Sequence, residues 1–251
     1  MEQVLLISFL SGLATGVGGL IVVWFGQPTA KVLGFYLGLS AGMMGMVVLV
    51  DLLPAALQYG TVKQTLIGLI IGIALMLIFD LALASFLATG KSRKVNPAIQ
   101  PKFKRNFLRM GYFMTFAIAL HNIPEGLAIG AGFASQSELG IRVALVIALH
   151  NIPEGLGVAS TLFLGKIKKV FVVLLPIATG FFIPLGTMLA NLLGSIVADW
   201  ITFGLSIAGG AMGYLVIKDI GPESLKQSPI IGRTGIGVGI FIMYLVYHLH
   251  S

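Results

Sequence analysis

The middle of the chain contains one ten-residue sequence twice. Ile118 to Leu127 reads IALHNIPEGL, and Ile147 to Leu156 repeats it letter for letter. In each copy the histidine and the glutamate are four residues apart, so on a helix they share one face. Imidazole nitrogens and carboxylate oxygens suit a divalent transition ion, Zn²⁺ especially. The repeat therefore predicts a metal site with six candidate ligands, which are His121, Asn122, Glu125, His150, Asn151 and Glu154.

Each motif also contains a proline and a glycine. Pro124 and Pro153 have no N–H to donate, so each helix is expected to kink and to leave a carbonyl free at the site. Gly126 and Gly155 allow another backbone or an ion to come close. A carboxylate at membrane depth needs a compensating cation, and neither apolar run carries a Lys or Arg near its motif. This favours a bound metal over two isolated histidine hydrogen bonds.

The elements that position these motifs are expected to be membrane helices. Hydrophobic residues make up 57% of the 251 residues and charged residues only 10%, whereas soluble domains carry about 25% charged residues. The predicted fold is an all-α polytopic membrane protein with eight transmembrane helices. The apolar runs long enough to cross a bilayer are 3–25, 33–57, 62–88, 108–132, 141–163, 170–194, 199–218 and 231–249.

These runs are expected to form one transmembrane domain, 1–251, in four parts. Helices 1–3 occupy 1–89, a basic cytoplasmic loop occupies 90–107, the metal-binding helices 4–5 occupy 108–163, and helices 6–8 occupy 164–251. Of the 16 Lys and Arg residues, only Lys63 and Arg142 fall at one set of helix ends. By the positive-inside rule the other ends are cytoplasmic, so both termini are expected outside the cell inner (plasma) membrane.

Composition excludes other chemistry and partners. The chain has no cysteine, so any metal must be held by nitrogen and oxygen ligands, with methionine sulfur as a weak addition. The net charge is +7, and most of the Lys and Arg residues lie in or next to the segments between apolar runs. This distribution indicates contact with a lipid bilayer and gives no support for nucleic acid as a partner.

A second, weaker repeat relates the two ends of the chain. Ser40 to Leu57 matches Ala208 to Leu225 at an offset of 168 residues, which pairs Asp51 with Asp219. Under the predicted topology the two segments run in opposite directions. We therefore expect an inverted repeat of helices 1–3 and 6–8 around helices 4–5, a plan that recurs in secondary transporters.

These segments together resemble the ZIP (Zrt/Irt-like) divalent-metal transporters, and the bacterial, broad-range branch most. The resemblance covers GLATGVGG in the first run, SAGMM and DLLP in the second, the twin motifs, PLG in the sixth, and AGG with DIGPE in the seventh. It implies that the six motif residues are transport-site ligands and that Glu125 and Glu154 bridge two ions. It further implies alternating-access uptake of Zn²⁺, with Fe²⁺, Mn²⁺, Co²⁺ or Cd²⁺ as further ions, and a homodimer as a possible assembly.

Two departures from the family pattern favour a single ion. Relatives with a two-metal site often have Glu-Pro-Leu-Gly in the sixth helix, but here the stretch is Ile183-Pro184-Leu185-Gly186. Asn151 stands where some relatives have an acid. The His-rich cytoplasmic loop of eukaryotic members is also missing, because residues 90–107 contain no histidine.

Outside the motifs, alternatives remain open. Asp51 would mark the outer mouth and Asp219, with Glu223, the inner mouth, either as ion-path residues or as interfacial caps. Met44, seven residues before Asp51, would share its face as a pathway or packing residue. Asp80 is expected to be a local hydrogen-bond partner. The rival function is an intramembrane metal-dependent hydrolase. Such an enzyme would ordinarily have an HExxH motif, but here Asn follows each motif histidine, so no enzyme activity is expected. A metal sensor or an efflux carrier also fits the sequence.

Overall fold

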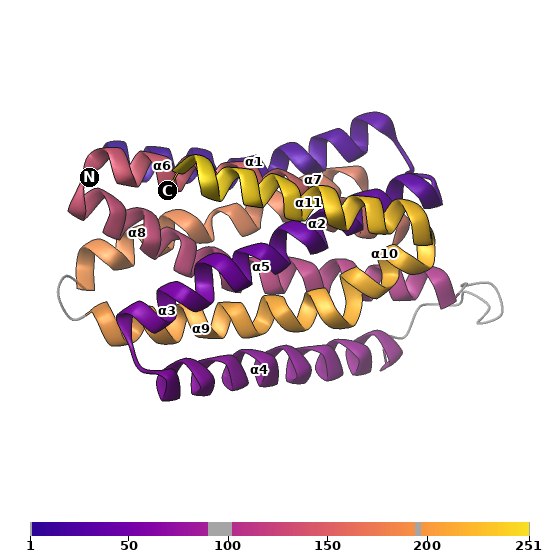
Figure 1. Cartoon of the computed structure of the whole chain (residues 1–251). Coiled ribbons are helices and arrows are strands. Elements are labelled where there is room, and N and C mark those ends of the chain that lie inside the picture. The colour runs from indigo at the N-terminus through magenta and orange to yellow at the C-terminus, as the bar shows by residue number, and fades with distance from the viewer. Residues whose placement is uncertain (1, 90–101, 194–196, 251) are drawn as a thin grey trace.

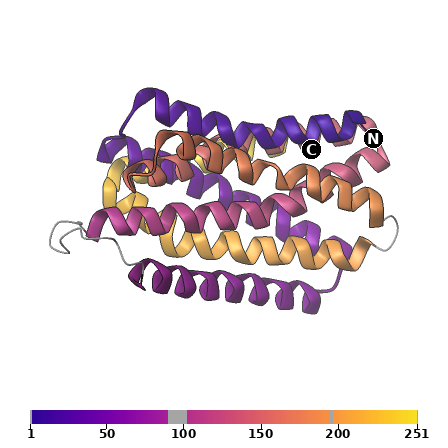
Figure 2. The ribbon, with the colours of Figure 1, turned by 180° about the vertical axis from the view of Figure 1, so that it is seen from behind.

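The computed structural model describes residues 2–89, 102–193 and 197–250. In these residues the regular structure is helical, and the helices run side by side as a bundle (Figures 1 and 2). Their bounds are α1 Glu2–Phe25, α2 Ala30–Met46, η1 Val47–Leu52, α3 Leu53–Tyr59, α4 Val62–Thr89, α5 Lys102–Ser135, α6 Ser137–Leu164, α7 Lys169–Gly180, α8 Phe182–Leu193, α9 Val197–Leu215, η3 Val216–Ile220, α10 Gly221–Gln227 and α11 Pro229–His250.

Seven helical stretches within the described residues are long and apolar enough to cross a membrane. Helix α5 is not among the seven; besides the polar motif, it has four basic residues in its first eight positions. It nevertheless runs along the bundle beside the others, and both chain ends lie at the same end of the bundle (Figures 1 and 2). The other stretches are Glu2–Phe25, Ala30–Tyr59, Val62–Ser85, Ser137–Leu164, Lys169–Leu192, Thr202–Gln227 and Pro229–His248.

Two predicted boundaries are wrong. Helix α5 begins at Lys102, inside the stretch 90–107 that was expected to be loop; residues 90–101 lie outside the described part. The seventh stretch continues to Gln227, beyond the expected end at 218 and through Gly221, Pro222 and Glu223. Pro222 sits in the first turn of α10, where a missing N–H costs little.

A wide π-helical turn precedes this proline, and the same device occurs in the second stretch. In η1 the N–H of Leu53 donates to the carbonyl of Val48, five residues back, and Pro54 follows. In η3 the N–H of Gly221 donates to Val216, and Pro222 follows. The wide turn gives each proline ring room against the preceding carbonyls, so the helix continues where an α-turn would clash.

The sixth stretch is divided at Phe181 between α7 and α8. Pro184 explains the break, because it cannot donate to the carbonyl of Gly180, four residues earlier. Around this point α1 packs along α6 and α8 packs along α5, while α2 packs along α11 and α9 along α4. Helices α1 and α7 meet at Gly12 and Gly180, where a Cβ on either glycine would collide with the carbonyl of the other.

Candidate metal centre

The two motifs lie on α5 and α6, which pack against each other and are joined through Gln136. Because such neighbours run in opposite directions, motifs equally far from the turn face one another at the same depth. Ligand atoms of His121, His150 and Glu154 all fall within 4.8 Å of one another. The structure thus brings both predicted histidines together with the second glutamate. The six candidate residues are at most 4% exposed.

Glu125 connects the two histidines. Its Oε1 lies 2.8 Å from Nε2 of His121 and 2.5 Å from Nε2 of His150. Its Oε2, both carboxylate oxygens of Glu154 and the Nδ1 atoms of both histidines are buried without a hydrogen-bond partner among the described residues. Buried carboxylate oxygens are costly when left unpaired. The donor set of two imidazoles and two carboxylates therefore fits a divalent cation.

The two asparagines connect the motif helices to their neighbours. The side-chain amide of Asn122 donates to the carbonyl of Thr179 at 2.7 Å, and that of Asn151 donates to the carbonyl of Ser11 at 3.2 Å. The amide oxygens of both asparagines have no hydrogen-bond partner in the part of the chain that the structure describes. Each asparagine thus uses its nitrogen for packing and keeps an oxygen available.

The motif glycines permit close contact between backbones. A Cβ on Gly126 would collide with the carbonyl of Ile183 in α8, and a Cβ on Gly155 would collide with the carbonyl of Thr15 in α1. Ile183 is fully buried, and it stands where the family resemblance described above implies a further carboxylate in proteins with a two-metal site. In this chain that position serves helix packing.

A cavity of about 550 Å³ leads to the centre from the end of the bundle that holds the termini. It runs from Tyr59, Leu139 and Tyr247, near the helix ends, to His121 and Glu125. Asp51 lines this cavity. Met44 does not line it; its side chain is 1% exposed within the core. The π-turn η1 contains Asp51, and its wider pitch rotates Asp51 relative to the α-helix that holds Met44.

A second cavity, of about 500 Å³, lies at the opposite end. Asp219 and Glu223 line it, as do Arg109 and Lys218, but its lining includes none of the six motif residues. Buried apolar side chains stand in between. Phe113, at the edge of this cavity, is fully buried, and it precedes His121 by two turns, or about 12 Å of helix.

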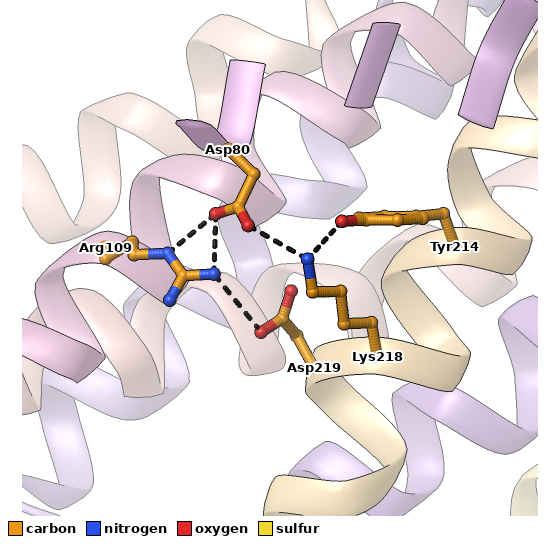
Figure 3. Close-up of polar contacts among 5 residues, drawn as sticks. All are labelled: Asp80, Arg109, Tyr214, Lys218 and Asp219. Atoms are coloured by element: carbon orange, nitrogen blue, oxygen red, sulfur yellow. Dashed lines mark hydrogen bonds and ion pairs between the residues drawn. The ribbon is translucent and has the colours of Figure 1, made fainter. Parts of the chain in front are cut away.

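Sequence reasoning missed a polar cluster beside this second cavity (Figure 3). Asp80 of α4 accepts a hydrogen bond from Nε of Arg109 in α5 at 2.6 Å and one from Nζ of Lys218 in η3 at 3.1 Å. Asp80 is thus an ion-pair partner of two other helices, and the prediction of a local partner is wrong. A signal was available: an acid within an apolar run requires a cation, and Arg109 begins the next run.

Comparison with known proteins identifies related chains. The family described as ZIP Zinc transporter matches residues 90–247. A protein of Escherichia fergusonii named zinc transporter ZupT is 33% identical over 232 residues, covering 91% of this chain and 89% of its own length.

Proteins of the same name give similar figures. The one from Salmonella arizonae is 32% identical over 257 residues, covering 98% of this chain and 99% of its own. The one from Chlorobaculum parvum is 32% identical over 232 residues, covering 87% and 86%. The relatives are named as transporters and not as enzymes. The chain is a transmembrane protein that belongs to the ZIP zinc transporter family.

Proposed function

We propose that this protein carries divalent transition-metal ions, Zn²⁺ above all, through the membrane into the cytoplasm. The observation that carries the proposal is the buried set of His121, Glu125, His150 and Glu154 at the bottom of a cavity open toward one end. Nitrogen and oxygen ligands of this kind also accept Fe²⁺, Mn²⁺, Co²⁺ and Cd²⁺. The names of the relatives favour transport over the intramembrane hydrolase.

In this proposal the ion binds between α5 and α6, with the two histidines and two glutamates as its main ligands. Oxygens of Asn122 and Asn151 complete the set as needed, since they lack hydrogen-bond partners in the described residues. The buried Ile183 favours one tightly held ion over two, because α8 supplies no carboxylate to the centre.

We further propose eight membrane crossings, with α5 as the eighth. An even number of crossings agrees with the two termini lying at one end of the bundle. The ends that hold Lys31, Lys166 and Lys226 then face the cytoplasm, and the termini face outward. Because the chain has no cysteine, single cysteines test this directly. Gln136→Cys should react with a membrane-impermeant maleimide from outside, and Gln27→Cys only after permeabilisation; the reverse pattern contradicts the orientation.

The contacts of the centre support the inverted repeat. Asn122 and Asn151 occupy equivalent motif positions, and their carbonyl partners, Thr179 and Ser11, differ by the same 168 residues that relate Asp219 to Asp51. Gly126 and Gly155 likewise meet Ile183 and Thr15, again 168 residues apart. The π-turns η1 and η3 repeat at this offset as well. A two-fold axis that exchanges α5 with α6 accounts for all three relationships.

Alternating access would follow from this arrangement. In the present structure the cavity of about 550 Å³, called here the outer cavity, reaches the centre and has Asp51 in its lining. On the cytoplasmic side of the centre, Phe113, Ile118 and Met212 are fully buried. Movement of one helix group against the other would close the outer cavity and open a path past Asp219 and Glu223. Met44 is buried and lines neither of the two cavities, so it would act as a packing residue.

Uptake into proteoliposomes that contain a zinc-sensitive dye tests the proposal. Wild-type protein should fill the lumen with Zn²⁺, and His150→Ala should abolish filling. His248→Ala is the matched control, because His248 is an exposed histidine outside the centre, and it should transport normally. Normal uptake by correctly inserted His150→Ala protein contradicts the site, and no uptake by wild-type protein contradicts transport.

A further inference from the structure

The cluster of Asp80, Arg109, Lys218 and Asp219, called here the inner ion-pair cluster, joins three helical stretches at the cytoplasmic end (Figure 3). Both Nε and one terminal nitrogen of Arg109 lie 2.6 Å from Oδ1 of Asp80. Lys218 takes the other oxygen of Asp80. Asp80 is therefore paired on both oxygens, from α5 and from η3.

Further contacts hold the two cations in place. Lys218 hydrogen-bonds the hydroxyl of Tyr214, one turn earlier, and its Nζ lies 4.7 Å from the centre of that ring. Arg109 reaches Asp219 more loosely, at 4.0 Å. Oδ2 of Asp219 is buried with no hydrogen-bond partner among the described residues. Asp219 is thus the weakly paired member of the cluster, and it lines the second cavity, of about 500 Å³.

The cluster connects α4 and α5, which also contact one another directly, but less extensively than they contact their main packing partners. Helix α5 packs most extensively against α6 and α8, whereas α4 packs against α9. The pair between Asp80 and Arg109 links α4 to α5, so these two helices cannot separate at the cytoplasmic end without breaking it. The side chain of Asp80 is only 7% exposed, so little water is available to replace a lost partner.

The proposed repeat makes the cluster informative, because its outer counterpart is missing. Arg109 corresponds to Glu138, as His121 corresponds to His150. Glu138 is 79% exposed and pairs with Arg142 of its own helix. Lys218 corresponds to Val50. Helix α11, which takes the place of α4, contains no acidic residue. Both cations of the cluster are therefore present only at the cytoplasmic end.

We propose that the inner ion-pair cluster is a closing device that holds the cytoplasmic exit shut and so makes the outward-open form the resting state. In an exact inverted repeat the outward-open and inward-open forms would have equal free energy, because the two-fold axis exchanges them. Residues that break the repeat decide which form prevails, and Arg109 and Lys218 break it. The inference depends on the proposed transport cycle, in which the exit opens between α5 and the α4–α9 pair.

A labelling experiment on metal-free protein tests the device without requiring transport. Ala131 lines the outer cavity and is small, so Ala131→Cys provides a single reporter in a chain that has no cysteine. Its reaction rate with an impermeant maleimide measures how often the outer cavity is open. Adding Arg109→Gln should lower this rate by roughly fivefold or more, since allosteric couplings are commonly of that size.

Two further variants distinguish closure from simple structural support. The exchange Asp80→Arg with Arg109→Asp restores the pair between α4 and α5 but places a second cation against Lys218. The labelling rate should therefore recover in part, to above that of the single Arg109→Gln variant. Lys226→Gln is the matched control, because Lys226 pairs with Glu223 within one helix at the same end and joins no two helices; it should leave the rate unchanged. If Arg109→Gln does not fold, Arg109→Lys keeps the charge without the fork of donors and should give an intermediate rate.

The results separate the two proposals. An unchanged rate in folded Arg109→Gln or Arg109→Lys protein overturns the closing device. A charge exchange that folds but labels no faster than Arg109→Gln overturns it as well. Neither result bears on metal transport, which the dye assay measures by itself.

Discussion

Glu125 and His150 meet across the contact between α5 and α6, with Oε1 of the glutamate 2.5 Å from Nε2 of the histidine. The same oxygen lies 2.8 Å from Nε2 of His121. One carboxylate oxygen thus lies close to Nε2 of both imidazoles, where a metal ion shared by the two histidines would also lie. Binding of an ion therefore requires Glu125 to exchange two histidine contacts for one contact with the metal.

Loss of this carboxylate should weaken metal binding severely. Loss of a residue that only hydrogen-bonds to a metal ligand lowers metal affinity by roughly 10–100-fold. We expect Glu125→Gln to reduce Zn²⁺ affinity by more than this, because it removes a proposed direct ligand and its charge. Competition with a chelator dye in detergent measures the affinity. Glu138→Gln, at a glutamate that is 79% exposed, should bind as the wild type does. Equal affinity for both variants would remove Glu125 from the ligand set.

Zn²⁺ binding should weaken as the pH falls. The metal requires neutral imidazoles at His121 and His150 and ionised carboxylates at Glu125 and Glu154, so protons compete with the ion for the same atoms. Each proton displaced on binding lowers the apparent affinity by up to about tenfold per unit of pH. Dye competition between about pH 7.5 and 5.5 spans the ordinary imidazole range. A constant affinity over this range would contradict histidine ligation.

The number of bound ions should depend on position 151. Wild-type protein is expected to hold one Zn²⁺ per chain, because Ile183 and Asn151 supply no negative charge. Asn151→Asp adds a carboxylate to the centre and should admit a second ion, at the cost of the amide hydrogen bond to Ser11. Equilibrium dialysis followed by elemental analysis gives the stoichiometry. Two ions in the wild type would show that the present ligands suffice.

Helix packing at the centre should tolerate no added methyl group. Gly155→Ala places a Cβ against the backbone of Thr15, which cannot rotate away as a side chain can. Overpacking of this kind costs about 1–3 kcal/mol. Gly45→Ala is the control, because its Cβ would meet nothing within 4 Å, and removing a helical glycine gains about 0.5–1 kcal/mol. Thermal unfolding in detergent compares them; equal midpoints would contradict the close contact.

The sequence predicted most of the helical stretches because each is a long apolar run between polar turns. It did not predict the π-turns at Val47–Leu52 and Val216–Ile220, since a change of helical pitch leaves no mark in the hydropathy of an apolar run. Whether the chain breaks or widens there depends on packing against other helices. The seventh run was accordingly expected to end at 218, although the helical stretch continues to Gln227.

The candidate centre could be located from sequence because its residues recur as a unit. The spacing of His121 and Glu125 defines a face, and the repeat at His150 and Glu154 supplies its partner. The ion pairs of Asp80 could not be assigned in this way. Their members lie on three separate helices, and side-chain reach across helices is set by the fold, which a single sequence does not report.

If ions enter as proposed, the outer cavity also determines where an ion would lose its water. Water occupies roughly 30 Å³ per molecule in the liquid, so the cavity of about 550 Å³ has room for an ion that keeps its first hydration shell. In the proposed transport cycle, dehydration would take place beside His121 and Glu125, as a stepwise exchange of water for protein ligands. Mg²⁺ gives up its waters reluctantly. This bundle would therefore discriminate against abundant Mg²⁺ by the slowness of that exchange as well as by ligand preference.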